Sequence, residues 1–337
     1  MNKLSAVLRL RMVLMKKVLL LGLAALLLGA PLTRAESVSD ETRTTLRSQL
    51  LRMINRDRER FGLRPVGLDP ATSAMADAYC REQVRNRTMG HFSLDGQAPY
   101  MRYSFAGGND GISENAAAWS ANYSFSDRSL YEMMRRSEDS MMSEAGPHDG
   151  HRRAILDPWA TDVGIGLAWE RGEFRIVEEF IRRYIQWSRV IPRSASIGER
   201  VLISGKPASG YVVGAITVHR DPLPRPMSAL TVNAIDSYSL PESRREYRPR
   251  LKQWFRPRSG GGIEEIRDEY SDGRTGDFSV SDDGSFSFAA PFEEGPGVYT
   301  VVVWLHPTSA SAIIPASNIS IRVETPPASP SAVGGTR

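Results

Sequence analysis

The sequence predicts an α/β domain followed by an all-β domain, within a chain of 337 residues. Apolar residues at helical spacing recur between residues 40 and 141, and alternation over residues 162–184 then indicates a pair of strands. From Ser188 to Gly198 the composition changes to short β-rich runs separated by Gly, Pro, Asp and Ser. The roughly 300 residues that follow a leader suit two domains of ordinary size.

The chain opens with a segment typical of a signal peptide, which we predict over residues 1–35. Basic residues precede an apolar run at 18–28, and Thr33-Arg34-Ala35 places small residues where a signal peptidase cleaves. The run is shorter than the roughly 20 apolar residues that a membrane span needs. Translation could start at Met1, Met12 or Met15, because each start would give a complete signal peptide. We expect an exported protein, secreted or held in the periplasm or cell envelope, with no integral membrane segment in the mature chain.

Charge and cysteine content narrow the class of protein. Without residues 1–35 the chain keeps 37 basic and 39 acidic residues, a net charge of −2. No basic stripe interleaved with aromatic residues follows, so nucleic acid is not an expected partner. Cys80 is the single cysteine, which excludes an intramolecular disulfide. We expect it to be a small buried residue rather than a reactive thiol.

Helix signals mark the first domain, which we place at residues 36–188. Asp40 is the expected N-cap of the first helix and Gly62 its stop, while Asp69-Pro70 is a cap followed by proline at the first helical position. Gly146-Pro147 ends a later helix, because proline cannot continue one. The expected helical segments are 40–61, 70–86, 99–103 and 130–141, with a compact small-residue segment at 112–117.

The segment 141–169 joins a helix end, a histidine-bearing turn and a strand. His151 follows the turn 147–150 and begins one helical turn, which Asp157-Pro158 breaks. Residues 162–169 alternate large apolar residues with glycine and alanine, which predicts a strand packed closely on its small-residue face. Arg171-Gly172 is a tight-turn signal that joins it to a strand at 173–184. The pairs Glu178-Glu179 and Arg182-Arg183 are expected on a solvated face.

Two His and two Glu form the candidate site. His91 follows a predicted helix end, and Glu114 lies among apolar residues where an unpaired carboxylate would be costly, so a partner is expected. Glu144 precedes His151 by seven residues, and Glu138 and Asp139 compete with it for this role.

Three motifs resemble the CAP superfamily, which includes cysteine-rich secretory proteins, antigen five and plant pathogenesis-related proteins. They are GHFSLDG at 90–96, SENAAAW at 113–119 and GHRRAILDPWATDVGIGLAW at 150–169. The resemblance covers residues 43–184 and is closest to the disulfide-free bacterial branch. It implies an α-β-α sandwich with a central antiparallel sheet, and an open cleft lined by His91, Glu114, Glu144 and His151. The sequence departs from the family at two positions. Ser113 stands before Glu114 where the family has glycine, and Met141 or Met142 stands where the family usually has a tryptophan one turn before the second Glu.

Two imidazoles and two carboxylates support three kinds of chemistry. They suit a divalent metal such as Zn²⁺, an acid–base pair, or a structural polar network without turnover. The sequence has neither a Gly-x-Ser-x-Gly elbow nor a His-Glu-x-x-His helix, and we expect His148 to be solvated. Members of the family are linked to lipid or sterol binding, metal binding and proteolysis. We favour a protein that binds a divalent metal or a small polar or lipid ligand, with a secreted metal-assisted or acid–base hydrolase of peptide or cell-wall material as the alternative.

The second domain is predicted as an immunoglobulin-like β-sandwich at residues 189–325, followed by a disordered tail at 326–337. The insertion at 239–275 is expected to be a long loop or an extra hairpin. Trp254 and Phe255 within it would either form a ligand platform or pack against the sandwich. No catalytic constellation is visible, so we expect this domain to dock the protein on a wall or envelope surface. The expected strands are 201–203, 211–218, 230–232, 278–280, 285–288, 299–305 and 319–323.

Overall fold

The computed structural model describes residues 30–242 and 244–325. The chain divides within helix α2 (Ala30–Arg60) into two compact units, one up to Gln49 and one from Leu50 onward. Residues 1–29 of the predicted signal peptide and the whole predicted tail lie outside the described ranges. Within these ranges, no helix is long and apolar enough to cross a membrane. Helix α2 already includes residues 30–39, so Asp40 lies within the helix and the predicted N-cap is wrong.

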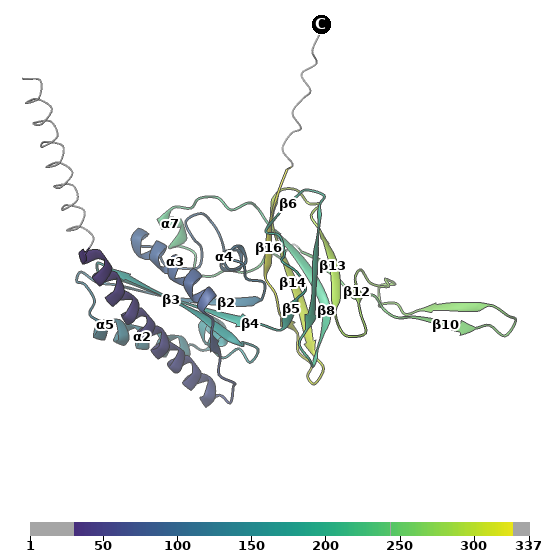
Figure 1. Ribbon diagram of the computed structural model, residues 1–337, viewed down its shortest axis with the longest axis horizontal. Helices are drawn as coiled ribbons and strands as arrows, with labels where there is room; N and C mark the ends of the chain where they lie inside the picture. Colours follow the sequence, from purple (N-terminus) through teal and green to yellow (C-terminus); the bar gives the residue numbers. More distant parts are fainter. Residues whose placement is uncertain (1–29, 243, 326–337) are drawn as a thin grey trace, which may run out of the picture. The chain divides into compact units, whose positions relative to one another are not determined.

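A four-stranded sheet in the order β1-β3-β4-β2 forms the centre of the first domain. Strand β4 (Glu173–Arg182) pairs antiparallel with β3 (Asp162–Glu170) and with β2 (Gly111–Ser120), while the short β1 (Gly67–Leu68) runs parallel to β3. Helix and strand alternate along this part of the chain, and Figure 1 shows α3 beside the sheet. The predicted α/β class is confirmed. The helices are α3 (Pro70–Asn86), α4 (Pro99–Phe105), α5 (Asp127–Met142) and α6 (Gly150–Ile155), with a 3-10 turn at Gly146–His148.

Local sequence signals explain how α3 starts and how it packs. The Asp69 carboxylate accepts a hydrogen bond from Thr72 N at 2.7 Å, so the predicted cap is confirmed. An ideal Cβ on Gly164 would lie 2.5 Å from Thr72, and one on Gly166 would lie 2.3 Å from the Ala76 backbone. The small-residue face of β3 is therefore what lets helix and strand approach so closely.

Strand β2 and the burial of β4 differ from the predictions. The segment 112–117 is the middle of a ten-residue strand, because its pairing with β4 outweighs the weak strand preference of alanine. Glu178 and Glu179 are 1% and 0% exposed, so the predicted solvated face is wrong for this pair, whereas Arg183 is exposed. Both glutamate side chains are buried because β4 lies between β3 and β2 and packs against other elements on each face.

The second domain contains two sheets that share one apolar core, whose members include Ile203, Phe288, Val301 and Ile321. One sheet has the order β12-β13-β7-β5, and the other β6-β16-β14-β8-β9 with β15 beside β14. Because β5 pairs with β7, this arrangement begins a few residues before the predicted boundary at 189. The predicted β-rich class agrees with this arrangement, while the immunoglobulin-like assignment stays a prediction. The strands are β5 (Ile185–Trp187), β6 (Ser194–Ser196), β7 (Arg200–Pro207), β8 (Tyr211–Asp221), β9 (Arg244–Tyr247), β12 (Ser279–Val280), β13 (Phe286–Pro291), β14 (Gly297–Pro307), β15 (Ile314–Pro315) and β16 (Ile319–Glu324).

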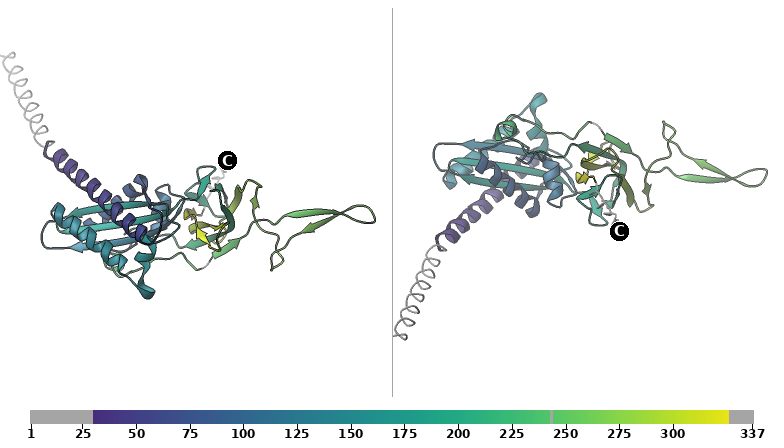
Figure 2. Two further views of the ribbon diagram at one scale, coloured as in Figure 1. Left: turned by 90° about the horizontal axis from the view of Figure 1, so that it is seen from below. Right: turned by 90° about the horizontal axis from the view of Figure 1, so that it is seen from above.

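One segment of this domain corrects the predictions, and the insertion agrees with the predicted extra hairpin. Residues 230–232 form a helical turn, α7 (Ala229–Val232), because the Ser228 hydroxyl caps Thr231 N at 3.1 Å. The insertion contains a hairpin of β10 (Gln253–Pro257) and β11 (Ile263–Arg267), which stands apart from both sheets (Figure 1, Figure 2). Trp254 and Phe255 are 54% and 67% exposed, so they do not pack against the sandwich.

The second domain covers the free edge of β2. Ile112 N donates to Asn318 Oδ1 at 2.9 Å, and Glu114 N donates to the Tyr238 hydroxyl at 2.6 Å. An ideal Cβ on Gly111 would lie 2.0 Å from the carbonyl oxygen of Pro315, so only glycine fits at this crossing. An edge strand with unpaired N–H groups is a template for unwanted pairing, and here side chains of the second domain occupy it.

Candidate functional site

The four predicted site residues lie around one cleft of about 220 Å³. His91 follows α3 and His151 belongs to α6, and both rings line the cleft. Glu114 on β2 stands behind His91, and Glu144, just after α5, stands behind His151. The remaining lining residues are Gln83, Met89, Gly90, Ala116, Ala117, Asn233, Ile235 and Asp236.

His91 is held by a buried polar network. Its Nδ1 donates to Glu114 Oε1 at 2.8 Å, and Arg102 on α4 pairs with the other Glu114 oxygen. Arg102 also donates to the His91 carbonyl at 2.5 Å and stacks on the Tyr79 ring, with its guanidinium carbon 3.6 Å from the ring centroid. Glu114 thus has the partner that its apolar sequence setting required.

The electrostatics behind His91 are set by two buried acids and one base. Burial acts to raise the pKa of the Glu114 carboxyl, but Arg102 and His91 together lower it, so Glu114 is ionised. Burial, reinforced by Glu114, raises the pKa of Glu179 well above its ordinary value. Glu179 is therefore a neutral acid. The charges in this network balance, because the Glu114 carboxylate is paired with the Arg102 guanidinium.

His151 forms a second, more open pair. Its Nδ1 lies 2.5 Å from Glu144 Oε1, and its backbone N–H donates to Glu144 Oε2 at 3.0 Å. Asp139 instead pairs with Arg135, and Glu138 is buried against Glu178. Of the three predicted candidates, only Glu144 is hydrogen-bonded to His151.

The pairs determine what the cleft offers to a ligand. Each Nδ1 is engaged by a carboxylate, which leaves Nε2 as the free nitrogen of each ring. Neither Glu114 nor Glu144 lines the cleft. Within residues 30–242 and 244–325, no three His, Cys, Asp or Glu side chains are grouped closely enough to hold one metal ion. The two glutamates orient the imidazoles and leave Nε2 of each ring toward the cleft, and carboxylates often orient histidines in this way in proteins.

Sequence reasoning missed two contributors to the site. Tyr238, from the second domain, accepts a hydrogen bond from Glu114 N at 2.6 Å, and its ring centroid lies 4.8 Å from that of His91. No local pattern around Tyr238 indicated this role. Arg102 had one indirect signal, the partner that Glu114 needed.

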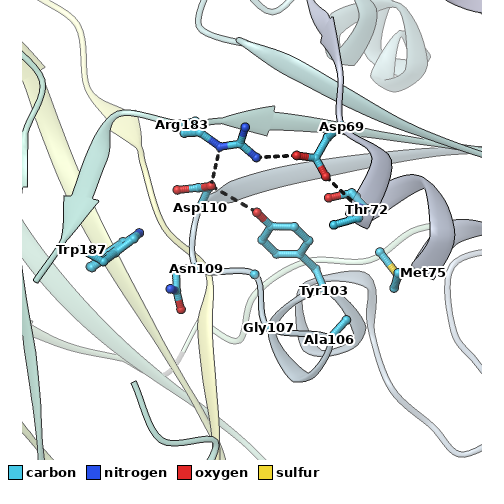
Figure 3. A pocket seen from close by; sticks show the side chains of 12 residues that line it. Asp69, Thr72, Met75, Tyr103, Ala106, Gly107, Asn109, Asp110, Arg183 and Trp187 are labelled. Carbon is cyan, nitrogen blue, oxygen red and sulfur yellow. Dashed lines mark hydrogen bonds and ion pairs between the residues drawn. The ribbon is translucent and has the colours of Figure 1, made fainter. Parts of the chain in front are cut away.

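A second pocket of about 280 Å³ lies near the end of β4 (Figure 3). Figure 3 shows Arg183 between two carboxylates. Its guanidinium nitrogens lie 3.2 Å from the Asp110 carboxylate and 2.7 Å from that of Asp69. Tyr103 donates to Asp110 at 3.4 Å. These charges are paired with one another and Asp69 caps α3, so the residues here have structural roles. None of the predicted site residues lines this pocket.

The fold and the cleft define an α/β domain that presents two carboxylate-paired histidines. Residues 51–177 match the family described as "CAP: Cysteine-rich secretory protein family", so the chain carries a CAP domain, as its motifs predicted. Among solved structures it is similar to an extracellular protein containing a SCP domain from Bacillus anthracis str. Ames, with 20% identity and a TM-score of 0.31. The match covers 40% of this chain and 40% of that one, less than half of either. No curated protein matches this sequence.

Proposed function

We propose that this is an exported CAP-domain binding protein whose cleft holds a divalent metal, with Zn²⁺ as the first candidate. The observation that carries the proposal is that His91 and His151 line one cleft while each Nδ1 is bonded to a carboxylate. Neutral imidazoles oriented in this way are good zinc ligands. Two protein ligands leave coordination positions for water or for a small polar ligand. A lipid ligand is the other binding role that the CAP family suggests.

Zinc titration calorimetry on the metal-stripped full chain tests this proposal. We expect saturable binding that is lost in His91→Ala and in His151→Ala, because each removes one of two ligands. His148→Ala is the matched control: this exposed histidine lies three residues before His151 and does not line the cleft. Equal affinity in the wild type and the His91→Ala/His151→Ala double variant would refute the assignment.

A hydrolase is the alternative, and the His151–Glu144 pair favours it. A half-exposed histidine held by a carboxylate is the usual arrangement of a general base. Nucleophilic catalysis by Cys80 is unsupported, because the side chain is fully buried and burial raises the pKa of its thiol. Release of dye from labelled casein and from labelled peptidoglycan measures turnover. Activity that disappears in His151→Ala would favour the hydrolase over the binding protein.

Docking on an envelope surface is the role we propose for the second domain. Its support is the β10–β11 hairpin, where Trp254, Phe255 and Ile263 are all more than half exposed. Exposed aromatic and aliphatic side chains of this kind are typical of interaction sites. Sedimentation with cell-envelope preparations tests the role, and a Trp254→Ser/Phe255→Ser variant should remain in the supernatant. Retention of that variant in the pellet at the wild-type level would exclude the hairpin.

A further inference from the structure

A segment of the second domain forms one wall of the cleft. Residues 222–241, which we name the strap, lead from the end of β8 toward β9. Asn233, Ile235 and Asp236 of the strap line the cleft together with His91 and His151. The cleft is therefore composite, because residues of the CAP domain alone do not enclose it.

Backbone hydrogen bonds fasten the strap along the cleft. Met227 N donates to the Leu94 carbonyl at 2.7 Å. The Asn233 side chain accepts from Met89 N at 2.9 Å and donates to the Arg87 carbonyl at 3.3 Å. Since these bonds use backbone groups of the loops beside His91, they hold the strap against the rim of the site.

Two glycines of the CAP domain let the strap approach. Gly96 has φ +85°, and an ideal Cβ there would lie 2.4 Å from the Arg225 carbonyl oxygen. Gly90, directly before His91, has φ +118°, and its Cβ would lie 3.2 Å from the Ile235 carbonyl oxygen. A side chain at Gly96 would collide with the strap, so the surface of the CAP domain is shaped to receive it.

The strap shields one histidine more than the other. Tyr238 lies against the His91 ring and bonds to Glu114 N. The His91 side chain is 9% exposed, whereas that of His151 is 35% exposed. Ligands therefore reach the two rings unequally.

The size and charge of the cleft limit what it can take. Its 220 Å³ equals the liquid volume of about seven water molecules and lies below the roughly 300–1,000 Å³ of typical ligand pockets. Among the lining residues there is no Lys or Arg, and Asp236 of the strap is the one carboxylate. A metal ion with its waters or another small cation fits these limits, while an acyl chain or a peptide does not.

We infer that the strap determines the specificity of the cleft, closing it to chain-like ligands and favouring small cations through Asp236. This inference rests on the proposed function in taking the cleft as the ligand site. Its two parts, shielding by Tyr238 and selection by Asp236, are tested separately.

Carbethoxylation of histidine by diethyl pyrocarbonate, followed by peptide mass spectrometry, tests the shielding without any metal. In Tyr238→Ala we expect the His91 rate to rise roughly fourfold, as the exposed fraction of its side chain moves from 9% toward the 35% of His151. Tyr238→Phe is the matched control, since it keeps the ring and loses only the hydroxyl. The exposed His148 serves as the internal reference. Asn233→Ala, which loosens the strap nearby, is a second variant expected to raise the rate less.

An unchanged His91 rate in both Tyr238→Ala and Asn233→Ala, with near-ultraviolet circular dichroism preserved, would overturn the shielding. For the charge, Asp236→Asn should weaken Zn²⁺ binding by roughly threefold or more, while Asp282→Asn, at an exposed turn, should not. Equal affinities would overturn the role of Asp236. If wild-type protein bound no Zn²⁺ while His91 remained shielded, the proposed metal site would fail and the strap would still form the wall of the cleft.

Discussion

The buried pair Glu138–Glu178 makes stability depend on pH, and Glu138→Gln tests this. The two carboxyl groups are 2% and 1% exposed and act on each other's pKa, and neither Glu138 oxygen has a hydrogen-bond partner among the described residues. Asn115 donates to Glu178 at 3.2 Å. Two acids in this position hold at least one proton between them.

The magnitude follows from the pKa of Glu178, which burial raises from 4.5 to about 7. Because the folded-state pKa lies above the unfolded value, the stabilisation is complete below pH 4.5 and is lost as pH rises through about 7. A shift of this size corresponds to about 3 kcal/mol of unfolding free energy. Burial together with Glu178 also raises the pKa of Glu138, which acts in the same direction. In Glu138→Gln the amide donates to Glu178, so its carboxylate is favoured and the pH dependence becomes smaller.

Urea unfolding of the full chain between pH 4.5 and 8 measures the effect. Trp119 is a suitable fluorescent probe, because its Nε1 donates to Ser137 on the same helix as Glu138 at 2.8 Å. The difference in unfolding free energy between wild type and Glu138→Gln should grow with pH in favour of the variant. Glu132→Gln, more exposed on that helix, is the control and should follow the wild type. Parallel curves for wild type and Glu138→Gln would refute the shared proton.

Three further predictions follow from the site and from the contact between the domains. Arg102→Met should lower the unfolding free energy by about 3–5 kcal/mol, because it leaves Glu114 buried without its charge partner; a urea titration equal to wild type would contradict the ion pair. Gly111→Ala should cost about 1–3 kcal/mol by forcing its Cβ against the Pro315 carbonyl, and an unchanged melting temperature would show that the crossing relaxes freely. Glu144→Gln should weaken Zn²⁺ binding by about 10–100-fold in calorimetry, and full affinity would exclude Glu144 as the partner that orients the imidazole.

Local signals were enough to predict several elements of the fold. The Asp69-Pro70 cap, the glycine face of β3 and the Arg171-Gly172 turn each depend on residues close in sequence, and each is confirmed. Strand β2 was missed because its alanines carry little strand preference, and its pairing partner lies more than fifty residues away. The burial of Glu178 was missed for a related reason: a strand covered on both faces does not alternate, so its charged residues resemble those of a solvated face.

The site likewise contains residues that the sequence predicted and residues that depend on contacts distant in sequence. The four predicted residues form two hydrogen-bonded pairs. They could be predicted because the resemblance to the family implies them and because the apolar sequence around Glu114 required a partner for its carboxylate. Tyr238 escaped notice since 124 residues separate it from Glu114, and tyrosine in a linker suggests nothing by itself. Whether the four residues bind metal stays a prediction.

The covered edge of β2 also has a consequence for the order of events during synthesis. Ile112 and the Asn318 side chain that caps its N–H are 206 residues apart. At about 5–20 residues per second, roughly 10–40 s pass between the emergence of the strand and that of its cap. In the later part of that interval, once β4 has emerged and paired with β2, the nascent sheet presents an open edge. A chaperone or a holding factor that occupies this edge would protect the chain when it is most prone to mispairing.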